Sequence, residues 1–342
     1  MDMTKRLGLA LLAALLLSDA ALGQEKVLNL YSSRHYQTDE ALYTEFTRKT
    51  GIRIQRIEAP EDALIERLKN EGASSPADVL VTVDAGRLWR AEQAGLFDAV
   101  KSAELDRRIP ANLRHPEGLW FGFSTRARVI VFNRDKVKPG EVRGYADLAA
   151  PKWKGNVCMR SSSNIYNLSL AAAFVARQGV PKTEEWARGV VANFARAPKG
   201  GDTDQIKSVA AGECALTLAN TYYYARLARS SKPEELEAIA KTGVIWPDQG
   251  AGGTHVNISG AGMLKHAPHP LEAVRFLEYL ASDEAQRYFA DGNNEYPAVG
   301  TVKTDNPALA RLGAYKADTL NVSALGRHQP DAQKLYDRAG WR

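Results

Sequence analysis

The sequence predicts an α/β protein of two lobes joined by strands that cross between them, with a ligand cleft in the middle. From residue 27 onward, short apolar runs alternate with amphipathic helical segments, and this alternation restarts after residues 128–132. The chain has 342 residues. Single hydrophobic cores stop growing at about 250–300 residues, so two cores are expected.

The first part of the chain reads as strands alternating with helices. Val27 to Tyr31 is a short apolar run, and Leu42 and Phe46 then lie on one face of a helix that Gly51 can end. The further expected segments are strands at residues 52–57 and 78–83, and helices at residues 61–70 and through Leu88 to Gly95. A βαβαβ order predicts a parallel sheet that is covered by helices.

The second part repeats this pattern. The expected strands are residues 128–132, 155–159, 215–218 and 254–264. One expected helix is capped by Ser163-Asn164 and runs through residues 168–176, and the others are residues 206–211, 271–280 and 284–289, with another after Asn220-Thr221. The chain would pass between the lobes near residues 124–130 and return near residues 250–257, where crossing strands would form a hinge. The predicted division is a first lobe at residues 24–125, a second lobe at 126–252, and the rest of the first lobe with the C-terminal helices at 253–342.

Residues 1–23 are typical of an export signal. Lys5 and Arg6 precede an apolar run that ends at Leu17, and Ala21-Leu22-Gly23 resembles a cleavage site. This run is shorter than the roughly 20 residues that a membrane-spanning helix needs. We therefore expect a soluble protein in the periplasm.

Charge and cysteine content narrow the function further. The net charge is +5, but charges of both signs are interspersed, so nucleic acid is not an expected partner. Cys158 and Cys214 could form a disulfide in an oxidising compartment, and the sequence leaves this open. Two cysteines at this separation are not a zinc signature.

Tyrosines recur where predicted strands give way to predicted helices, at Tyr36, at Tyr166 and at Tyr222-Tyr223-Tyr224. Ligands of open parallel sheets bind at such junctions, and the positive helix end there favours an ionised phenol. A free phenol has a pKa of about 10, but a trivalent cation can deprotonate it. A hard ion such as Fe(III) is therefore the leading candidate. The alternative is that these tyrosines pack in the core or stack on an organic ligand, and we expect Tyr224 to pack.

Six segments carry a resemblance that covers essentially the whole chain after residue 23. They are LYSSRHYQTD (30–39), SPADVLVTVDAGRLWRAEQAGLF (75–97), WFGFSTRARVIVFN (120–133), PKWKGNVCMRSSSNIYN (151–167), LTLANTYYYARL (216–227) and GTHVNISGAG (253–262). In this order they resemble the periplasmic ferric-ion-binding proteins of iron ABC importers, the FbpA/FutA-like family, and most of all its cyanobacterial FutA-like branch. The resemblance implies the type II periplasmic-binding-protein fold.

The resemblance also implies roles for particular residues. The positions that match iron ligands of the family are Tyr36, Tyr166, Tyr222 and Tyr223, and His35 matches a histidine that ligates iron in some members only. Arg126 and Arg226 match arginines that hydrogen-bond to the phenolates or balance their charge.

These implications predict a binding protein and not an enzyme. We expect a monomer that captures Fe(III), with Fe(II) also possible, and delivers it to an ABC permease in the inner membrane. The alternative function is binding of a small organic or anionic solute, such as a phosphonate, a polyamine or a sugar, with tyrosines stacking on it and arginines pairing with its charge.

Overall fold

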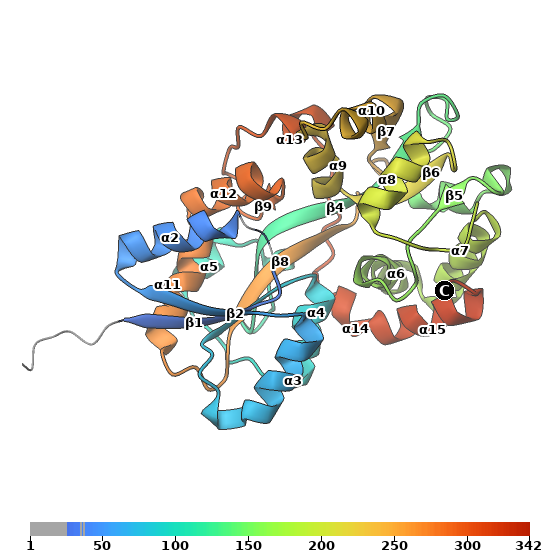
Figure 1. Cartoon of the computed structure of the whole chain (residues 1–342). Coiled ribbons are helices and arrows are strands. Elements are labelled where there is room, and N and C mark those ends of the chain that lie inside the picture. The colour runs from blue at the N-terminus through green and yellow to red at the C-terminus, as the bar shows by residue number, and fades with distance from the viewer. Residues whose placement is uncertain (1–25, 35, 37) are drawn as a thin grey trace, which may run out of the picture.

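The computed structural model describes residues 26–342 apart from residues 35 and 37, and Figure 1 shows two α/β halves connected by two long strands. The predicted export signal lies outside the described residues. Within residues 26–342, no helix is long and apolar enough to cross a membrane. We call the half built on the first three strands the first lobe and the other half the second lobe.

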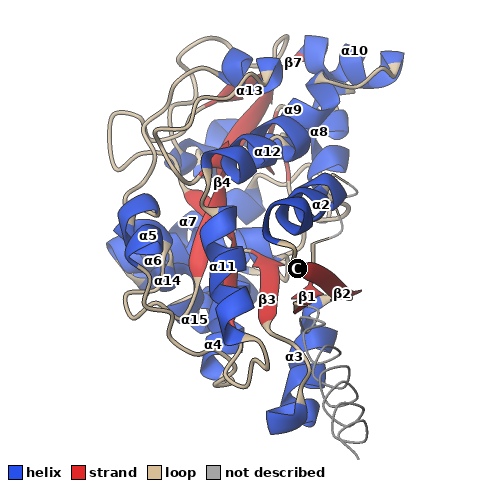
Figure 2. Cartoon of the chain, turned by 90° about the vertical axis from the view of Figure 1, so that its left-hand side faces the viewer, coloured by secondary structure: helices blue, strands red, loops and turns tan. Residues whose placement is uncertain are grey.

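The first lobe begins with a parallel βαβαβ unit, which confirms the prediction. Its strands are β1 (Val27–Ser32), β2 (Arg53–Glu58) and β3 (Val79–Val83), and its helices are α2 (Asp39–Thr50), α3 (Glu61–Glu71) and α4 (Ala85–Gln93). Strand β1 pairs in parallel with both β2 and β3. Gly51 ends α2 at a φ of 70°, in the left-handed region that favours glycine. Figure 2 shows helices on both sides of these strands.

Two strands connect the lobes. Strand β4 (Phe121–Asn133) pairs with β8 (Val256–Met263) through residues 121–127 and with β6 (Leu216–Asn220) through residues 128–132. Strand β8 also pairs with β3, so the sheet order is β2-β1-β3-β8-β4-β6-β5. Strand β4 includes the predicted first crossing at residues 124–130, and β8 begins at residue 256, inside the predicted return near residues 250–257; the exact crossing points stay a prediction.

The second lobe has its own core around β4, β6 and the long helix α6. Its elements are β5 (Val157–Cys158), β7 (Thr242–Ile245), α6 (Ile165–Gln178), α7 (Val180–Ala192), α8 (Asp202–Ala210), α9 (Thr221–Ala228) and α10 (Pro233–Lys241). The predicted strand at 155–159 is reduced to two residues. Cys158 and Cys214 form a disulfide, which settles the question that the sequence left open.

The chain after β8 serves both lobes. Its elements are α11 (Pro270–Leu280), α12 (Asp283–Asn293), β9 (Tyr296–Pro297), α13 (Pro307–Leu312), α14 (Ser323–Arg327) and α15 (Gln329–Ala339). Helix α5 (Ala103–Arg108) lies earlier in the chain, before β4. Phe276 and Phe289 lie in the core of the first lobe. Leu335, Tyr336 and Trp341 lie in the core of the second lobe, so the last helix packs there. The ranges predicted for the lobes stay a prediction.

Candidate metal centre

Three of the predicted tyrosines begin helices of the second lobe. Tyr166 is the second residue of α6, and its backbone N–H donates to Oδ1 of the helix cap Asn164 at 3.2 Å. Tyr222 and Tyr223 lie in the first turn of α9, directly after β6. Because β6 and the segment before α6 end at the same side of the sheet, both helix starts face the boundary between the lobes.

These three tyrosines converge. The hydroxyl oxygens of Tyr166 and Tyr222 are 3.1 Å apart, and the ring centroids of Tyr222 and Tyr223 are 4.2 Å apart. Tyr222 is only 3% exposed. The fold therefore brings Tyr166 and Tyr222, which are 56 residues apart in the sequence, into one cluster of phenols.

Tyr36 faces this cluster from the first lobe. It lies between β1 and α2, and the guanidinium carbon of Arg34 is 4.7 Å from its ring centroid. Tyr36 is also close enough to Tyr223 for the two groups to influence each other electrostatically. The structure therefore brings together Tyr36, Tyr166, Tyr222 and Tyr223. His35, the other predicted ligand, lies outside the described residues.

Tyr224 points away from the cluster, as expected. It is buried in a separate hydrophobic cluster, and its hydroxyl donates to the carbonyl oxygen of Thr242 at 3.2 Å. Consecutive residues of a helix are turned by about 100° from each other, so Tyr224 cannot follow Tyr222 and Tyr223 toward the same point. The prediction that it packs is confirmed.

Burial dominates the ionisation of the phenols. It raises the pKa of Tyr36 to about 12, and the charge of Glu295 adds to this while Arg34 and Arg126 oppose it. Burial also raises the pKa of Tyr166 and of Tyr222, and neighbouring tyrosines raise both further. Burial therefore outweighs the favourable effect of the helix ends, which agrees with the expectation that these phenols need a cation in order to ionise. At neutral pH they are neutral until a cation displaces their protons.

Arg126 lies behind Tyr222 and is fully buried. Its guanidinium carbon is 5.7 Å from the Tyr222 ring centroid, and its Nη2 forms an ion pair with Glu295. Glu295 also binds Arg34 of the first lobe at 3.2 Å and accepts from the hydroxyl of Ser124 at 2.7 Å. Burial alone would raise the pKa of Glu295, but the charges of Arg126 and Arg34 outweigh it and lower the pKa to about 2. One carboxylate thus links the arginines beneath Tyr36 and Tyr222.

Arg226 lies beside Tyr223. Its guanidinium carbon is 5.1 Å from the Tyr223 ring centroid, and its Nη2 donates to the Thr203 hydroxyl at 3.2 Å. The structure thus places both predicted arginines against tyrosine rings of the cluster.

Sequence reasoning missed several charged residues next to the cluster. Arg128 and Arg160 lie 5.8 Å and 5.5 Å from the Tyr166 ring centroid, and both form ion pairs with the buried Asp202. A signal for Arg128 existed, because residues i and i+2 of a strand share a face and Arg126 had already been singled out. Arg160 belongs to the same motif as Tyr166. Nothing in the sequence pointed to Glu295 or Asp202.

The chemistry of the cluster suits a hard cation. Within residues 26–342, leaving out 35 and 37, no group of three or more His, Cys, Asp or Glu side chains could hold a metal ion. Four phenol oxygens are the remaining concentrated source of anionic ligands. Oxygen ligands of this kind favour hard ions over zinc or copper, which prefer nitrogen and sulfur.

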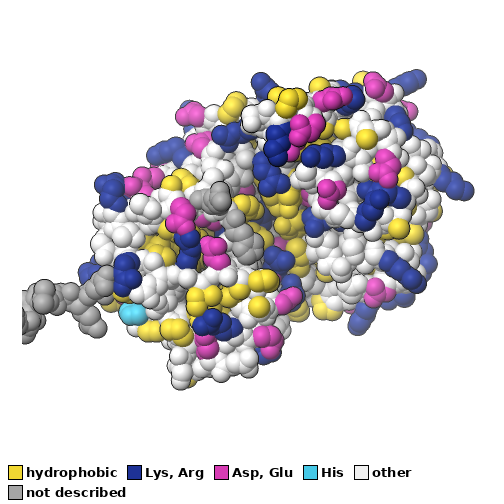
Figure 3. All heavy atoms as spheres, viewed as in Figure 1, with side chains coloured by type: hydrophobic (Ala, Val, Ile, Leu, Met, Phe, Trp, Pro, Cys, Tyr) yellow, Lys and Arg dark blue, Asp and Glu magenta, His cyan; other side chains and the backbone are white. Residues whose placement is uncertain are grey.

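A cavity of about 450 Å³ opens between the lobes beside the start of α6, where Asn164 and Ile165 line it; no tyrosine lines it. Arg87 and Arg90 line it from the first lobe, and Arg160, Ser161 and Ser163 line it from the second. Figure 3 shows side chains of the hydrophobic class, which includes tyrosine, in the furrow between the lobes, with Lys and Arg beside them. The cavity therefore reaches the helix start that carries Tyr166.

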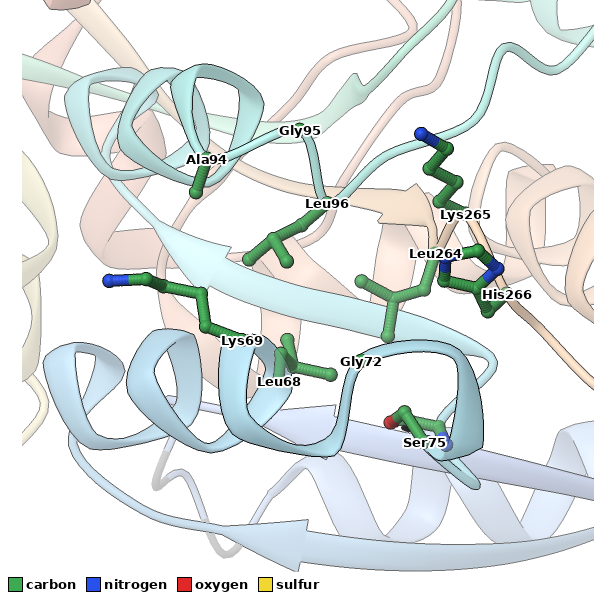
Figure 4. A pocket seen from close by; sticks show the side chains of 11 residues that line it. Leu68, Lys69, Gly72, Ser75, Ala94, Gly95, Leu96, Leu264, Lys265 and His266 are labelled. Atoms are coloured by element: carbon green, nitrogen blue, oxygen red, sulfur yellow. Dashed lines mark hydrogen bonds between the residues drawn. The ribbon is translucent and has the colours of Figure 1, made fainter.

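Another hollow, of about 240 Å³, is drawn in Figure 4. Leu68, Leu96 and Leu264 form its apolar wall, and Lys265 and His266 lie at its edge. No tyrosine and none of the described predicted ligands line it. It is separate from the tyrosine cluster.

Behind the tyrosines, Asp84 joins the lobes. Its Oδ1 accepts a hydrogen bond from the hydroxyl of Ser169 on α6 at 2.6 Å, and its Oδ2 accepts one from Asn257 on β8 at 2.9 Å. The backbone of Asp84 has a φ of 86°, which is strained for a residue with a side chain. These bonds hold the end of β3 against α6.

Comparison with known proteins gives consistent results. A model of the family described as bacterial extracellular solute-binding protein matches residues 74–320. The chain is 54% identical over 324 residues to iron uptake protein A2 of Synechocystis sp., which covers 94% of this chain and 92% of that protein.

Two solved structures are similar over nearly their whole length. FutA (IdiA) of Trichodesmium, in complex with iron and citrate ligands, has a TM-score of 0.90 and 56% identity, covering 92% of this chain and 100% of that one. Apo FutA2 of Synechocystis PCC6803 has a TM-score of 0.89 and 54% identity, covering 93% and 100%. The two-lobed fold is therefore shared with both.

Proposed function

This chain belongs to the bacterial extracellular solute-binding proteins, within their group of iron uptake and ferric-ion-binding proteins, and we propose that it captures Fe(III) between its lobes through tyrosine phenolates. Its family binds solutes and does not catalyse reactions. The proposed setting is the periplasm, where a monomer would deliver iron to the permease of an ABC importer in the inner membrane.

The observation that carries this proposal is the meeting of phenols from both lobes. Tyr166 and Tyr222 touch through their hydroxyls, the ring of Tyr223 packs against that of Tyr222, and Tyr36 faces them from the first lobe. Phenols that are neutral when metal-free become strong anionic ligands when a trivalent ion replaces their protons. The choice of iron is supported by the relatives whose names include iron or ferric iron, and by the Trichodesmium structure in complex with iron.

Binding would couple to closure of the lobes. The first lobe supplies Tyr36 and the second supplies Tyr166, Tyr222 and Tyr223, so an ion that binds all four stabilises the closed arrangement over the open one. Strands β4 and β8 are the crossing segments about which the lobes would move. Release would require protonation of the phenolates or reduction of the iron, because both weaken several bonds at once.

Charge supports a ferric complex. Fe(III) with four phenolates carries a net charge of −1, and the pair Arg128 and Arg160 around Asp202 carries +1, which offsets it. His35 is proposed as an additional ligand. If it ligates iron, His35→Ala should lower ferric affinity, and equal affinity in the variant argues against ligation.

Visible absorption tests the function directly. Phenolate-to-iron charge transfer should colour the ferric-loaded protein red to purple, and a strong chelator should remove the colour. A protein that stays colourless with ferric salts and keeps its iron-free stability would instead support the alternative, a binder of small organic or anionic solutes. The cations around the cavity between the lobes are the observation that favours this second candidate.

A further inference from the structure

We propose that Asp202 is a positioning residue for iron capture, because it fixes Arg128, Arg160 and the start of α9 so that Tyr166 and Tyr222 meet. The inference rests on the proposed function. Asp202 touches none of the tyrosines and would act only through the groups that it holds.

Asp202 uses both carboxylate oxygens. It is the first residue of α8 and is fully buried. Its Oδ2 accepts from Nη1 of Arg128 and from the backbone N–H of Asn220, both at 2.8 Å. Its Oδ1 accepts from Nη1 of Arg160 at 2.9 Å. Three donors from three different segments therefore converge on one side chain.

Each of these segments leads to a tyrosine of the cluster. Arg128 and Arg160 pack against the ring of Tyr166, and Nη2 of Arg128 also donates to Oδ1 of the neighbouring Asn167 at 2.9 Å. Asn220 ends β6, two residues before Tyr222. Asp202 is thus the shared anchor of the two helix starts whose phenols lie 3.1 Å apart.

A local helix-capping role does not explain why Asp202 is buried at the start of α8. The N–H of Gly201, at the start of α8, donates to Oδ2 of Asp204 at 2.7 Å, so the exposed Asp204 performs that local task. An asparagine could not replace Asp202, because an amide has one accepting oxygen and its NH₂ group would face a guanidinium donor. A carboxylate is required to satisfy donors on both sides.

The substitution Asp202→Asn distinguishes a positioning role from a purely electrostatic role, because the two roles predict opposite changes in ferric affinity. If Asp202 acted only through its negative charge, removing that charge beside phenolates would strengthen ferric binding. If it positions the tyrosines, the variant should bind ferric ion about 10- to 100-fold more weakly, the usual cost of losing a group that orients metal ligands. The charge-transfer band should also move, because the phenolates no longer hold the same geometry.

The experiment compares the full-length mature protein with Asp202→Asn and with the matched control Asp204→Asn. Ferric affinity is measured by chelator competition, the band by visible absorption, and folding by thermal unfolding without iron. We expect Asp204→Asn to lower thermal stability only, with band and affinity unchanged. Equal or tighter binding by a folded Asp202→Asn protein would overturn the proposal.

The experiment also distinguishes failure of the proposed function from failure of the Asp202→Asn variant to fold. If the wild type shows no band with ferric ion, the proposed function fails, and this inference fails with it. If Asp202→Asn does not fold, Arg160→Gln tests the same link, since Arg160 is partly exposed and reaches Tyr166 from its own segment. Arg160→Gln should weaken ferric binding and move the band, and an unchanged band with unchanged affinity would overturn the proposal.

Discussion

The hydroxyl oxygens of Tyr166 and Tyr222 lie 3.1 Å apart, although α6 and α9 bring these residues from positions 56 residues apart. Two phenols at this distance cannot both ionise without a cation between or beside them, because their charges would repel each other at short range. The pair therefore marks the place where a highly charged ion would be bound.

Removing one of these hydroxyls should weaken iron binding strongly. Tyr222→Phe keeps the ring and deletes the oxygen, so we expect ferric affinity to fall by more than about a hundredfold, beyond the usual effect of changing a group behind the ligands. The charge-transfer band should fade in parallel. Tyr224→Phe is the matched control, because that hydroxyl binds Thr242 instead. Loss of the band in both variants, or in neither, would contradict the account.

Iron binding should release protons and weaken as the pH falls. Burial raises the pKa of Tyr36 to about 12 and also raises those of Tyr166 and Tyr222, so all three phenols carry protons at neutral pH. Each phenolate that binds iron loses its proton, so apparent affinity should fall about a thousandfold per pH unit from these three tyrosines alone. Proton release measured against a chelator of known stoichiometry checks this, and Tyr222→Phe should release one proton fewer. An equal count in the variant would show that Tyr222 does not ligate the ion.

Glu295 should stabilise the iron-free fold above its unfolded pKa. Burial would raise its pKa, but Arg126 and Arg34 lower it from 4.5 to about 2. Because the folded pKa is depressed, the contribution is present above pH 4.5 and is lost as the pH falls toward 2. A shift of this size corresponds to about 3 kcal/mol. Glu295→Gln should therefore lower the free energy of unfolding by about 3 kcal/mol near pH 7, and the difference should shrink in acid.

Denaturant unfolding between pH 2 and pH 7 measures this effect. Glu66→Gln is the control, because Glu66 is exposed and pairs with Lys69 on the surface. Surface pairs contribute about 0–1 kcal/mol, so this variant should stay close to the wild type at every pH. A pH-independent loss in Glu295→Gln would mean that packing and not charge explains the role of Glu295.

The contact between Asp84 and Ser169 should favour lobe closure. Ser169→Ala removes a hydrogen bond of 2.6 Å between β3 and α6. Such bonds contribute about 1 kcal/mol, so ferric affinity should fall by about three- to tenfold, and small-angle scattering should show a more open iron-free protein. Ser323→Ala is the control, since that buried hydroxyl has no hydrogen-bond partner among the residues that the structure describes. An unchanged scattering profile in Ser169→Ala would remove Asp84 and Ser169 from the closing mechanism.

The sequence predicts much of this architecture because its local signals are strong. The apolar run from Val27 to Tyr31 became β1, and the cap at Asn164 became the start of α6. The clearest error in the predicted elements is β5. This strand is shorter than expected because loops, and not a long stretch of strand pairing, hold the segment around it. The packing of α15 on the second lobe depends on contacts between distant parts of the chain and had no local signal.

The residues of the candidate site that lie in recognisable sequence motifs could be predicted. The residues that reach the site only through folding could not. The tyrosines could be selected because each lies between a predicted strand and a predicted helix. Glu295 could not, because it lies in a loop 261 residues from its partner Arg34. The need for a cation to ionise the phenols followed from their ordinary pKa, but the extent to which burial raises that pKa was not visible in the sequence.

The central claim is that phenolates from both lobes meet at one ferric ion, and an iron-loaded crystal structure with anomalous scattering at the iron edge tests it most directly. We expect a single iron peak bonded to the phenolate oxygens of Tyr36, Tyr166, Tyr222 and Tyr223. An iron peak held mainly by carboxylates, or phenol oxygens that point away from it, would contradict the account.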